Sequence, residues 1–259
     1  MTKSNPLPEF PRVDLGSTEF ARRIALAAES EPEPAPRPKL RRVLGELEYC
    51  LEPFRRPFRA FDIAPAANPQ IVMILPGFAT RASKMRYMAR QLERAGHKTK
   101  RWGVGFNWGA DADALTLLER RLAEICERYN RNVVLLGWSM GGLYARELAK
   151  LHPNCIDKVI TMATPFSGSP RANNVWRLYQ AIAGHSVDNL PIRIDRAEKP
   201  PVETVALWSS ADGAIDPRSA AGVPGERDRA IALRCTHAGF TYSREAVHAV
   251  LEELDRTQP

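Results

Sequence analysis

The residues with the clearest chemical potential are a serine and the glycines around it. The GWSMG motif at residues 137–141 fits the pattern G-x-S-x-G, and Gly142 follows it. An apolar run precedes the motif and a helical spacing follows it, which is the setting of a nucleophile elbow. At such an elbow Gly137 and Gly141 leave room for neighbouring elements, and the turn lifts the Ser139 hydroxyl clear of the sheet. The pattern predicts a nucleophile at Ser139; the alternative is a Gly–Ser turn that only ends a strand.

A serine hydroxyl is a weak nucleophile at neutral pH and needs a general base. His237 lies in a loop directly after the last expected strand, and this position favours it as the base. An imidazole with an ordinary pKa of about 6.5 accepts and returns a proton near neutrality. The other histidines have less favourable settings, at a turn, a helix end, a candidate lid and the last helix: His97, His152, His185 and His248.

The base requires a carboxylate to orient it, and two candidates follow the expected strand at 204–208. Asp212 precedes Gly213 soon after the end of that strand, where a loop carboxylate can reach His237. Asp216 precedes Pro217 and is typical of a cap on a short helix. We therefore expect Asp212 to be the acid. The chain order Ser, Asp, His is the order expected of one particular fold.

Negative charge on a reacting carbonyl oxygen needs hydrogen-bond donors, and two backbone amides are placed to supply them. One is the N–H of Met140, the residue after the nucleophile. The other is the N–H of Phe78, in the Pro76-Gly77-Phe78 turn after an earlier strand. Gly77 would let the backbone approach the substrate oxygen closely. The alternative for this second segment is an ordinary turn.

These residues need a scaffold, and from residue 70 onward apolar runs alternate with helical spacings. Alternation of this kind indicates an α/β fold, with a mostly parallel sheet and helices on both faces. Strands are expected at 71–75, 99–102, 133–136, 159–162, 204–208 and 231–235. Helices are expected at about 83–95, 111–129, 140–151 and 243–254.

Two segments fall outside this alternation. Residues 1–60 form an N-terminal arm with a short helix at 17–30, a proline-rich linker and helical spacing at 39–49. Phenylalanines interleaved with Arg55, Arg56 and Arg59 follow, and we expect this stretch to pack its apolar side on the main domain. The alternative is a patch for a membrane surface or an acidic partner. Residues 61–259 are expected to form the main domain.

Residues 165–201 contain no clear strand, and we expect them to form a short helical lid over the site. Four side chains could give the lid helix its apolar face: Trp176, Leu178, Tyr179 and Ile182. Four arginines of the segment either bind an anionic substrate group or are solvated: Arg171, Arg177, Arg193 and Arg196.

Taken together, residues 70–255 resemble the α/β-hydrolase family, in particular its small lipase- and esterase-like members. The resemblance implies a triad of Ser139, Asp212 and His237, with Phe78 and Met140 as the oxyanion amides. Many members have histidine before the oxyanion glycine, where this chain has proline. Residues 1–60 fall outside the resemblance. It rests on six blocks in order: LPGF (75–78), WGVGFNWG (102–109), GWSMGG (137–142), TPFSGSPR (164–171), SSADGAID (209–216) and THAGF (236–240).

The sequence thus predicts a serine hydrolase that acts on a small-molecule carboxylic ester, with no metal or organic cofactor. An acyltransferase would use the same triad. A haloalkane dehalogenase or epoxide hydrolase would need an aspartate in place of Ser139. A non-enzymatic interaction protein on this fold is the alternative from another class.

Composition and charge limit the kinds of partner and the compartment that we expect for this protein. The net charge is +7 over 259 residues, without a dense Lys/Arg block or an aromatic stripe, so we expect no nucleic acid partner. The apolar runs are far short of the roughly 20 residues of a membrane span, so no stable membrane insertion is expected. The start lacks the apolar core of a secretory signal and the four cysteines are widely spaced, which favours a cytoplasmic protein with reduced thiols. Oligomeric state is not predicted.

Overall fold

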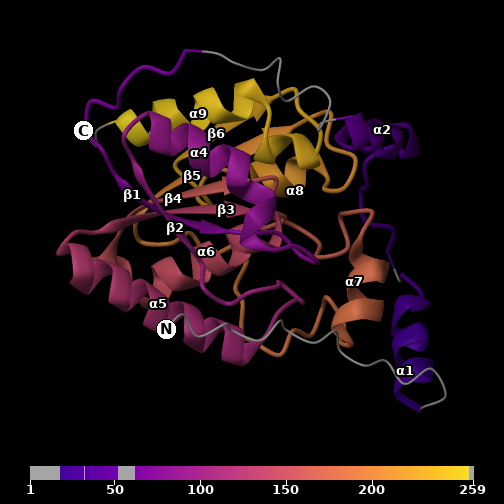
Figure 1. Cartoon of the computed structure of the whole chain (residues 1–259). Coiled ribbons are helices and arrows are strands. Elements are labelled where there is room, and N and C mark those ends of the chain that lie inside the picture. Colours follow the sequence, from indigo (N-terminus) through magenta and orange to yellow (C-terminus); the bar gives the residue numbers. More distant parts are fainter. Residues whose placement is uncertain (1–17, 32, 52–61, 257–259) are drawn as a thin grey trace, which may run out of the picture.

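A parallel sheet forms the centre of the protein (Figure 1). The computed structural model describes residues 18–31, 33–51 and 62–256, and within them the sheet has six strands in the order β2-β1-β3-β4-β5-β6. This confirms the predicted α/β fold with a parallel sheet. The strands are β1 (Ile71–Leu75), β2 (Lys98–Arg101), β3 (Val133–Trp138), β4 (Ile156–Met162), β5 (Glu203–Ser209) and β6 (Arg229–Leu233).

Strand β1 has the limits that the sequence predicts, whereas β4 begins three residues earlier than predicted, at Ile156. The side chains of β1 and β3 are buried along their whole length, so apolar runs mark them. The edge strand β2 has the sequence KTKR and is partly exposed. The other edge strand, β6, begins two residues earlier than predicted because its first residues are only partly buried.

Helices cover both faces of the sheet, as Figure 1 shows. Alternate residues along β1 and β3 enter two separate cores, as the period of two in a strand requires. One core joins the sheet to α4 and α9, and the other joins it to α5 and α6. The helices of the main domain are α4 (Arg86–Arg94), α5 (Ala112–Tyr129), α6 (Met140–Leu151), α7 (Trp176–Ala183), α8 (Pro217–Ala221) and α9 (Arg244–Asp255).

The carboxyl edge of the sheet brings the predicted site residues to one end of the molecule. All strands run parallel, so the segments that follow β1, β3, β5 and β6 meet there. They carry Phe78, Ser139, Asp212 and His237, respectively. Ligand sites of open parallel sheets lie at this edge.

The candidate lid segment contains one helix, α7. Trp176 and Tyr179 are buried, in line with the expected apolar face. Leu178 is 57% exposed, so its place on that face was a wrong prediction. Residues three positions apart share a face of a helix, as Trp176 and Tyr179 do, but residues two positions apart do not. Leu178 therefore points to solvent.

The N-terminal arm contributes α1 (Thr18–Ala27), α2 (Leu40–Gly45) and the 3-10 helix η1 (Glu46–Leu51). Three leucines of α2 and η1 are exposed, while the polar side chain of Glu46 contacts the main domain: Leu40 is 80% exposed, Leu44 68% and Leu47 62%. The aromatic–arginine stretch at 54–61 lies outside the described residues.

Candidate active site

Ser139 occupies a strained turn between β3 and α6. Its φ of 53° and ψ of −125° are unfavourable for a residue with a side chain. The surrounding backbone holds it there: the Ser139 N–H donates to the carbonyl of Met162 (2.7 Å), and the Thr164 hydroxyl donates to the Ser139 carbonyl (2.9 Å). Strain that is fixed in this way is typical of a functional turn.

The glycines of the motif let the elbow approach its neighbours. A Cβ atom on Gly141 would lie 2.2 Å from the Leu75 carbonyl oxygen, at the end of β1. A Cβ on Gly137 would lie 2.4 Å from the Cα of Gly142. The motif therefore needs glycine for packing, as the sequence indicates.

A Gly141→Ala variant tests this packing. Backbone of β1 would have to move away from α6, so we expect the free energy of unfolding to fall by about 3 kcal/mol. Chemical denaturation measures the change. Gly45→Ala is the matched control, because its Cβ would make an ordinary 3.8 Å contact with Thr236, and we expect its effect to stay within about 1 kcal/mol. Equal losses in the two variants would contradict the account of the elbow.

Asp212 and His237 form a hydrogen-bonded pair. The distance from His237 Nδ1 to Asp212 Oδ2 is 2.9 Å, and Asp212 is 1% exposed. The other carboxylate oxygen accepts from the N–H groups of Ala214 (2.7 Å) and Ile215 (2.8 Å). These contacts fix the carboxylate. Because an ionised carboxylate only accepts, the pair favours the tautomer with hydrogen on Nδ1 and a free lone pair on Nε2.

Asp216, the other candidate acid, has a structural contact. Its side chain accepts from the N–H of Arg218 (2.9 Å) and caps α8, with Pro217 at the first helical position. This is the helix cap that the sequence indicates. The structure thus brings Asp212, not Asp216, to His237.

His237 lies in a charged and largely buried setting. Burial lowers its pKa, but Asp212 raises it through charge and hydrogen bonding, and the charge of Glu46 adds to this, so that the pKa lies above the ordinary value. The charge of Lys84 acts in the opposite direction. The Trp138 indole donates to the His237 carbonyl (3.0 Å) and fixes the loop.

Ser139 and His237 are not hydrogen-bonded to each other among the described residues. Ser139 lies in the turn after β3. His237 lies in the loop after β6, where its carbonyl accepts the hydrogen bond from the Trp138 indole. In enzymes without substrate, the bond between nucleophile and base is often long and forms in the complex. The Asp–His half of the predicted triad is therefore assembled in this structure.

The segment after β1 places a second backbone amide beside Ser139. A Cβ on Gly77 would lie 3.1 Å from the Cβ of Ser139, so this turn contacts the elbow. In the described part of the chain, neither the Phe78 N–H nor the Met140 N–H donates to another protein group. Two free amides at this place can bind an oxyanion.

Asn107 supports this segment, and sequence reasoning missed it. Its side chain donates to the Pro76 carbonyl (2.9 Å), and its backbone exchanges hydrogen bonds with Ala79 and Thr80 (both 2.8 Å). Asn107 is 1% exposed. Its place between two aromatic residues gave no signal, because the contact joins segments 31 residues apart.

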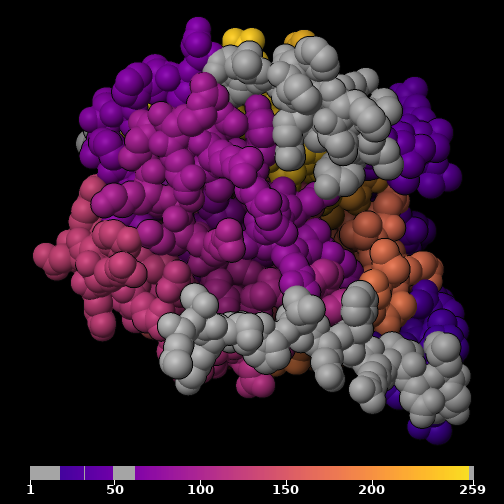
Figure 2. Space-filling model, viewed as in Figure 1, coloured from indigo at the N-terminus to yellow at the C-terminus, as the bar shows by residue number. Residues whose placement is uncertain are grey.

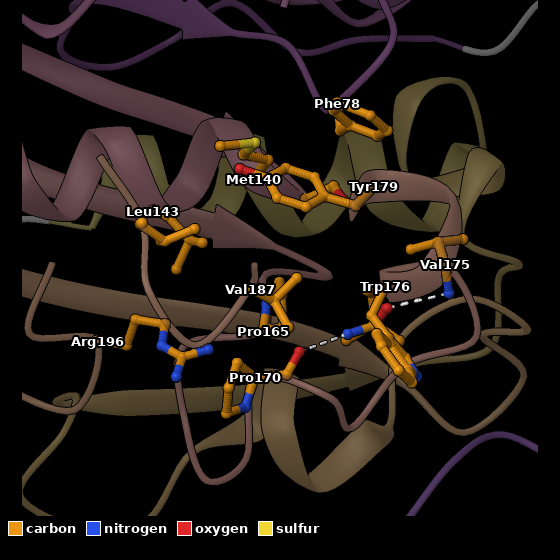
Figure 3. Close-up of a pocket in the computed structure, with 14 residues that line it drawn as sticks. Phe78, Met140, Leu143, Pro165, Pro170, Val175, Trp176, Tyr179, Val187 and Arg196 are labelled. Atoms are coloured by element: carbon orange, nitrogen blue, oxygen red, sulfur yellow. Dashed lines mark hydrogen bonds between the residues drawn. The ribbon is translucent and has the colours of Figure 1, made fainter. Parts of the chain in front are cut away.

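An apolar cavity of about 80 Å³ opens beside Ser139 (Figure 3). The centres of the Phe78 and Tyr179 rings are 4.9 Å apart, and both rings lie on one side of the cavity. Further lining residues come from α6, the lid segment with α7, and the loop after β5: Met140, Leu143, Pro165, Pro170, Asn173, Val175, Trp176, Val187, Leu190, Arg196 and Ile215.

Of the four lid arginines, Arg196 alone lines this cavity among the described residues. Burial lowers its pKa. Arg171 pairs with Asp188 (2.6 Å) and with the arm residue Glu29 (2.9 Å). Arg177 donates to backbone carbonyls of the arm, and Arg193 is exposed. Arg171 and Arg177 thus bind the arm and do not line the cavity, although Arg177 is also exposed to solvent.

The remaining histidines bind elsewhere. His97 accepts from the Gln70 N–H (3.1 Å), and His152 contacts Glu119 (2.8 Å). Burial lowers the pKa of His185, whose Nε2 lies 3.2 Å from the Ala110 carbonyl.

Within the described ranges, no group of three or more His, Cys, Asp or Glu side chains is arranged to hold a metal ion. No helix of the described chain has both the length and the apolar character needed to cross a membrane.

Known proteins share this architecture. A family model described as serine aminopeptidase, S33, matches residues 66–219, which is more than half of the chain. A solved monoacylglycerol lipase of Paleococcus ferrophilus has 12% identity and a TM-score of 0.53, over 74% of this chain and 95% of that one. The mature lipase BlEst2 of Bacillus licheniformis has 17% identity and a TM-score of 0.56, over 76% and 96%. At these identities the solved structures show the fold alone.

A curated relative matches a shorter part. The biotin biosynthesis bifunctional protein BioHC of Teredinibacter turnerae is 29% identical over 119 residues, which is 44% of this chain and 20% of that protein. The fold and the family model together show which family of proteins this chain belongs to. This chain belongs to the S33 serine aminopeptidase family of α/β-hydrolases.

Proposed function

We propose that this protein is a serine hydrolase that cleaves a carboxylic ester through an acyl-enzyme. The observation that carries the proposal is the 2.9 Å contact of Asp212 with His237, at the same sheet edge as the strained elbow of Ser139. Membership of the α/β-hydrolases and the likeness to solved lipases support a hydrolase of the lipase and esterase type.

In the proposed acylation step, the Ser139 oxygen attacks the acyl carbon and His237 Nε2 takes the hydroxyl proton. Asp212 holds the imidazole through Nδ1 and stabilises the cation that forms. The N–H groups of Phe78 and Met140 donate to the oxyanion. When the carbon–oxygen bond of the leaving group breaks, His237 returns the proton to the departing alkoxide.

Deacylation repeats these roles with water. His237 takes a proton from a water molecule, which attacks the acyl carbon of the Ser139 ester. The tetrahedral intermediate collapses, the bond to Ser139 breaks, and the proton returns to the serine oxygen. The products are a carboxylic acid and the regenerated enzyme.

The cavity favours an apolar ester over a peptide amino terminus. An α-ammonium group is held by carboxylates, and no aspartate or glutamate is among the lining residues that the structure describes. The charged lining group is Arg196, which would repel a cation. Apart from Ser139 and Asn173, the other lining side chains are aromatic or apolar and suit a hydrocarbon acyl or alcohol group.

Hydrolysis of p-nitrophenyl esters with acyl chains of increasing length tests the proposal. We expect turnover with a preferred length set by the cavity. Product analysis with an added alcohol acceptor separates hydrolysis from acyl transfer, since a transferase would form the new ester in place of the free acid. Absence of turnover with every ester, in properly folded protein, would contradict the proposal.

The pH dependence of kcat/KM tests the role of His237. The base acts in its neutral form, so activity rises as pH increases through the pKa of His237 in the free enzyme. Because that pKa is raised above the ordinary 6.5, we expect the midpoint of the rise to lie above pH 6.5. Steady-state kinetics across the pH range measures it. A midpoint below 6.5 would show that another group, or another environment, controls the reaction.

A further inference from the structure

One arm residue contacts both loops that carry the acid and the base. Glu46, at the start of η1, accepts three hydrogen bonds from backbone N–H groups. Its Oε1 accepts from Gly213 (3.0 Å) and from His237 (2.7 Å), and its Oε2 accepts from Ala238 (3.0 Å). Gly213 follows the acid Asp212 directly. A single carboxylate therefore joins the acid loop to the base loop.

The backbone of the arm also fits closely against the acid loop. A Cβ on Gly213 would lie 2.4 Å from the Arg42 carbonyl oxygen in α2, so the two backbones touch. The Asn174 side chain donates both to the Pro38 carbonyl (3.0 Å) and to the Gly213 carbonyl (2.8 Å). These contacts hold the arm at the place from which Glu46 reaches the loops.

The other end of the arm binds the helix that lines the cavity. Helix α1 lies against α7, and Figure 2 shows α7 between α1 and α2 on the surface. The Arg177 side chain donates to the carbonyls of Ala27 (2.7 Å) and Glu29 (3.0 Å). The Arg37 guanidinium lies 5.7 Å from the centre of the Trp176 ring. The arm thus reaches from the cavity wall to the catalytic loops.

We propose that Glu46 is a positioning residue of the active site, which holds the Asp212 and His237 loops in register from a segment outside residues 66–219, the region that the family model matches. This inference rests on the proposed function. Three N–H groups that point to one place need an acceptor, and without it each loses a hydrogen bond in a partly buried setting. An ionised carboxylate meets this need with strong bonds.

Glu46 also affects the charge balance of the base. The charged groups that face His237 are Asp212, Glu46 and Lys84. Burial lowers the pKa of His237, Asp212 and then Glu46 raise it, and Lys84 lowers it. Removal of the Glu46 charge should therefore lower this pKa. A role confined to packing of the arm would leave it unchanged.

The test uses Glu46→Gln and Glu46→Ala in the full chain, with Glu33→Gln as control. Glutamine keeps one carbonyl oxygen for two of the N–H groups but turns an NH₂ group to the third. Alanine removes all three contacts. Glu33 is an exposed glutamate of the same arm, on its proline-rich segment. Two measurements apply to each variant: the pKa of His237 by NMR titration of ¹⁵N-histidine-labelled protein, and kcat and KM for the preferred ester.

We expect the pKa of His237 to fall in both Glu46 variants and to match wild type in Glu33→Gln. The value of kcat should fall about 100-fold in Glu46→Ala, since small displacements of catalytic groups have effects of that size. The loss in Glu46→Gln should be smaller. KM should change little, because Glu46 does not line the cavity. If Glu46→Ala fails to fold, the titration and kinetics of Glu46→Gln decide the matter.

The two proposals fail in different ways. An unchanged His237 pKa and an unchanged kcat in the Glu46 variants, with an active wild type, would overturn the role of Glu46 and leave the hydrolase proposal standing. A lowered His237 pKa in Glu46→Gln, with no ester turnover by wild type, would support the positioning role and contradict the proposed function.

Discussion

The Ser139→Ala variant should lose ester turnover, with kcat reduced by about 10⁴-fold or more. Ser139 supplies the oxygen that forms the acyl-enzyme, and no neighbouring group can replace it. Alanine keeps the Cβ and meets the same backbone strain at φ 53°, so the fold should be preserved. Hydrolysis of the preferred p-nitrophenyl ester, corrected for the uncatalysed rate, measures the loss.

Circular dichroism and thermal unfolding serve as controls for this variant, and both should match wild type. Activity within tenfold of wild type would mean that Ser139 is not the nucleophile. In that case the G-x-S-x-G turn would be a structural turn at the end of β3, the alternative that the sequence leaves open.

The Asp212→Asn variant should have the second largest effect, a reduction in kcat of about 10⁴-fold. Asparagine can present its NH₂ group to His237 Nδ1, which favours the tautomer with hydrogen on Nε2 and removes the base. The other side-chain atom can still accept from Ala214 and Ile215, as Oδ1 of Asp212 does. The loop should therefore keep its conformation while the chemistry fails.

Asp216→Asn is the matched control, four residues along the same loop. Asparagine caps a helix about as well as aspartate, so the contact with Arg218 should persist and kcat should stay within about threefold of wild type. A greater loss in Asp216→Asn than in Asp212→Asn would show that the acid is assigned to the wrong carboxylate.

Much of the scaffold follows from sequence pattern alone. The central strands are buried on both faces and read as apolar runs, so β1 and β3 are easy to recognise. The parallel order then places the segments after the strands at one edge, which is why the candidate serine, acid and base could be expected at the same end of the sheet. The pairing of Asp212 with His237 depends on this topology, and not on any local signal.

The contacts of the arm could not be predicted in the same way. Glu46 lies 167 residues from Gly213 and 191 from His237 in sequence, and a lone glutamate in a helical stretch indicates a solvated face. The leucines beside it have the spacing of a helix face, and in the structure they are exposed. The sequence also did not indicate what Arg171 and Arg177 bind, because their partners are backbone carbonyls and carboxylates of the distant arm.

The most direct test of the central claim is covalent labelling with a fluorophosphonate, followed by mass spectrometry of the digested protein. A fluorophosphonate reacts with a serine that is activated by a base and faces an oxyanion site. The account predicts one adduct, on the peptide that contains Ser139, and none in the Ser139→Ala variant. Absence of an adduct in folded wild type, or an adduct that persists in Ser139→Ala, would contradict it.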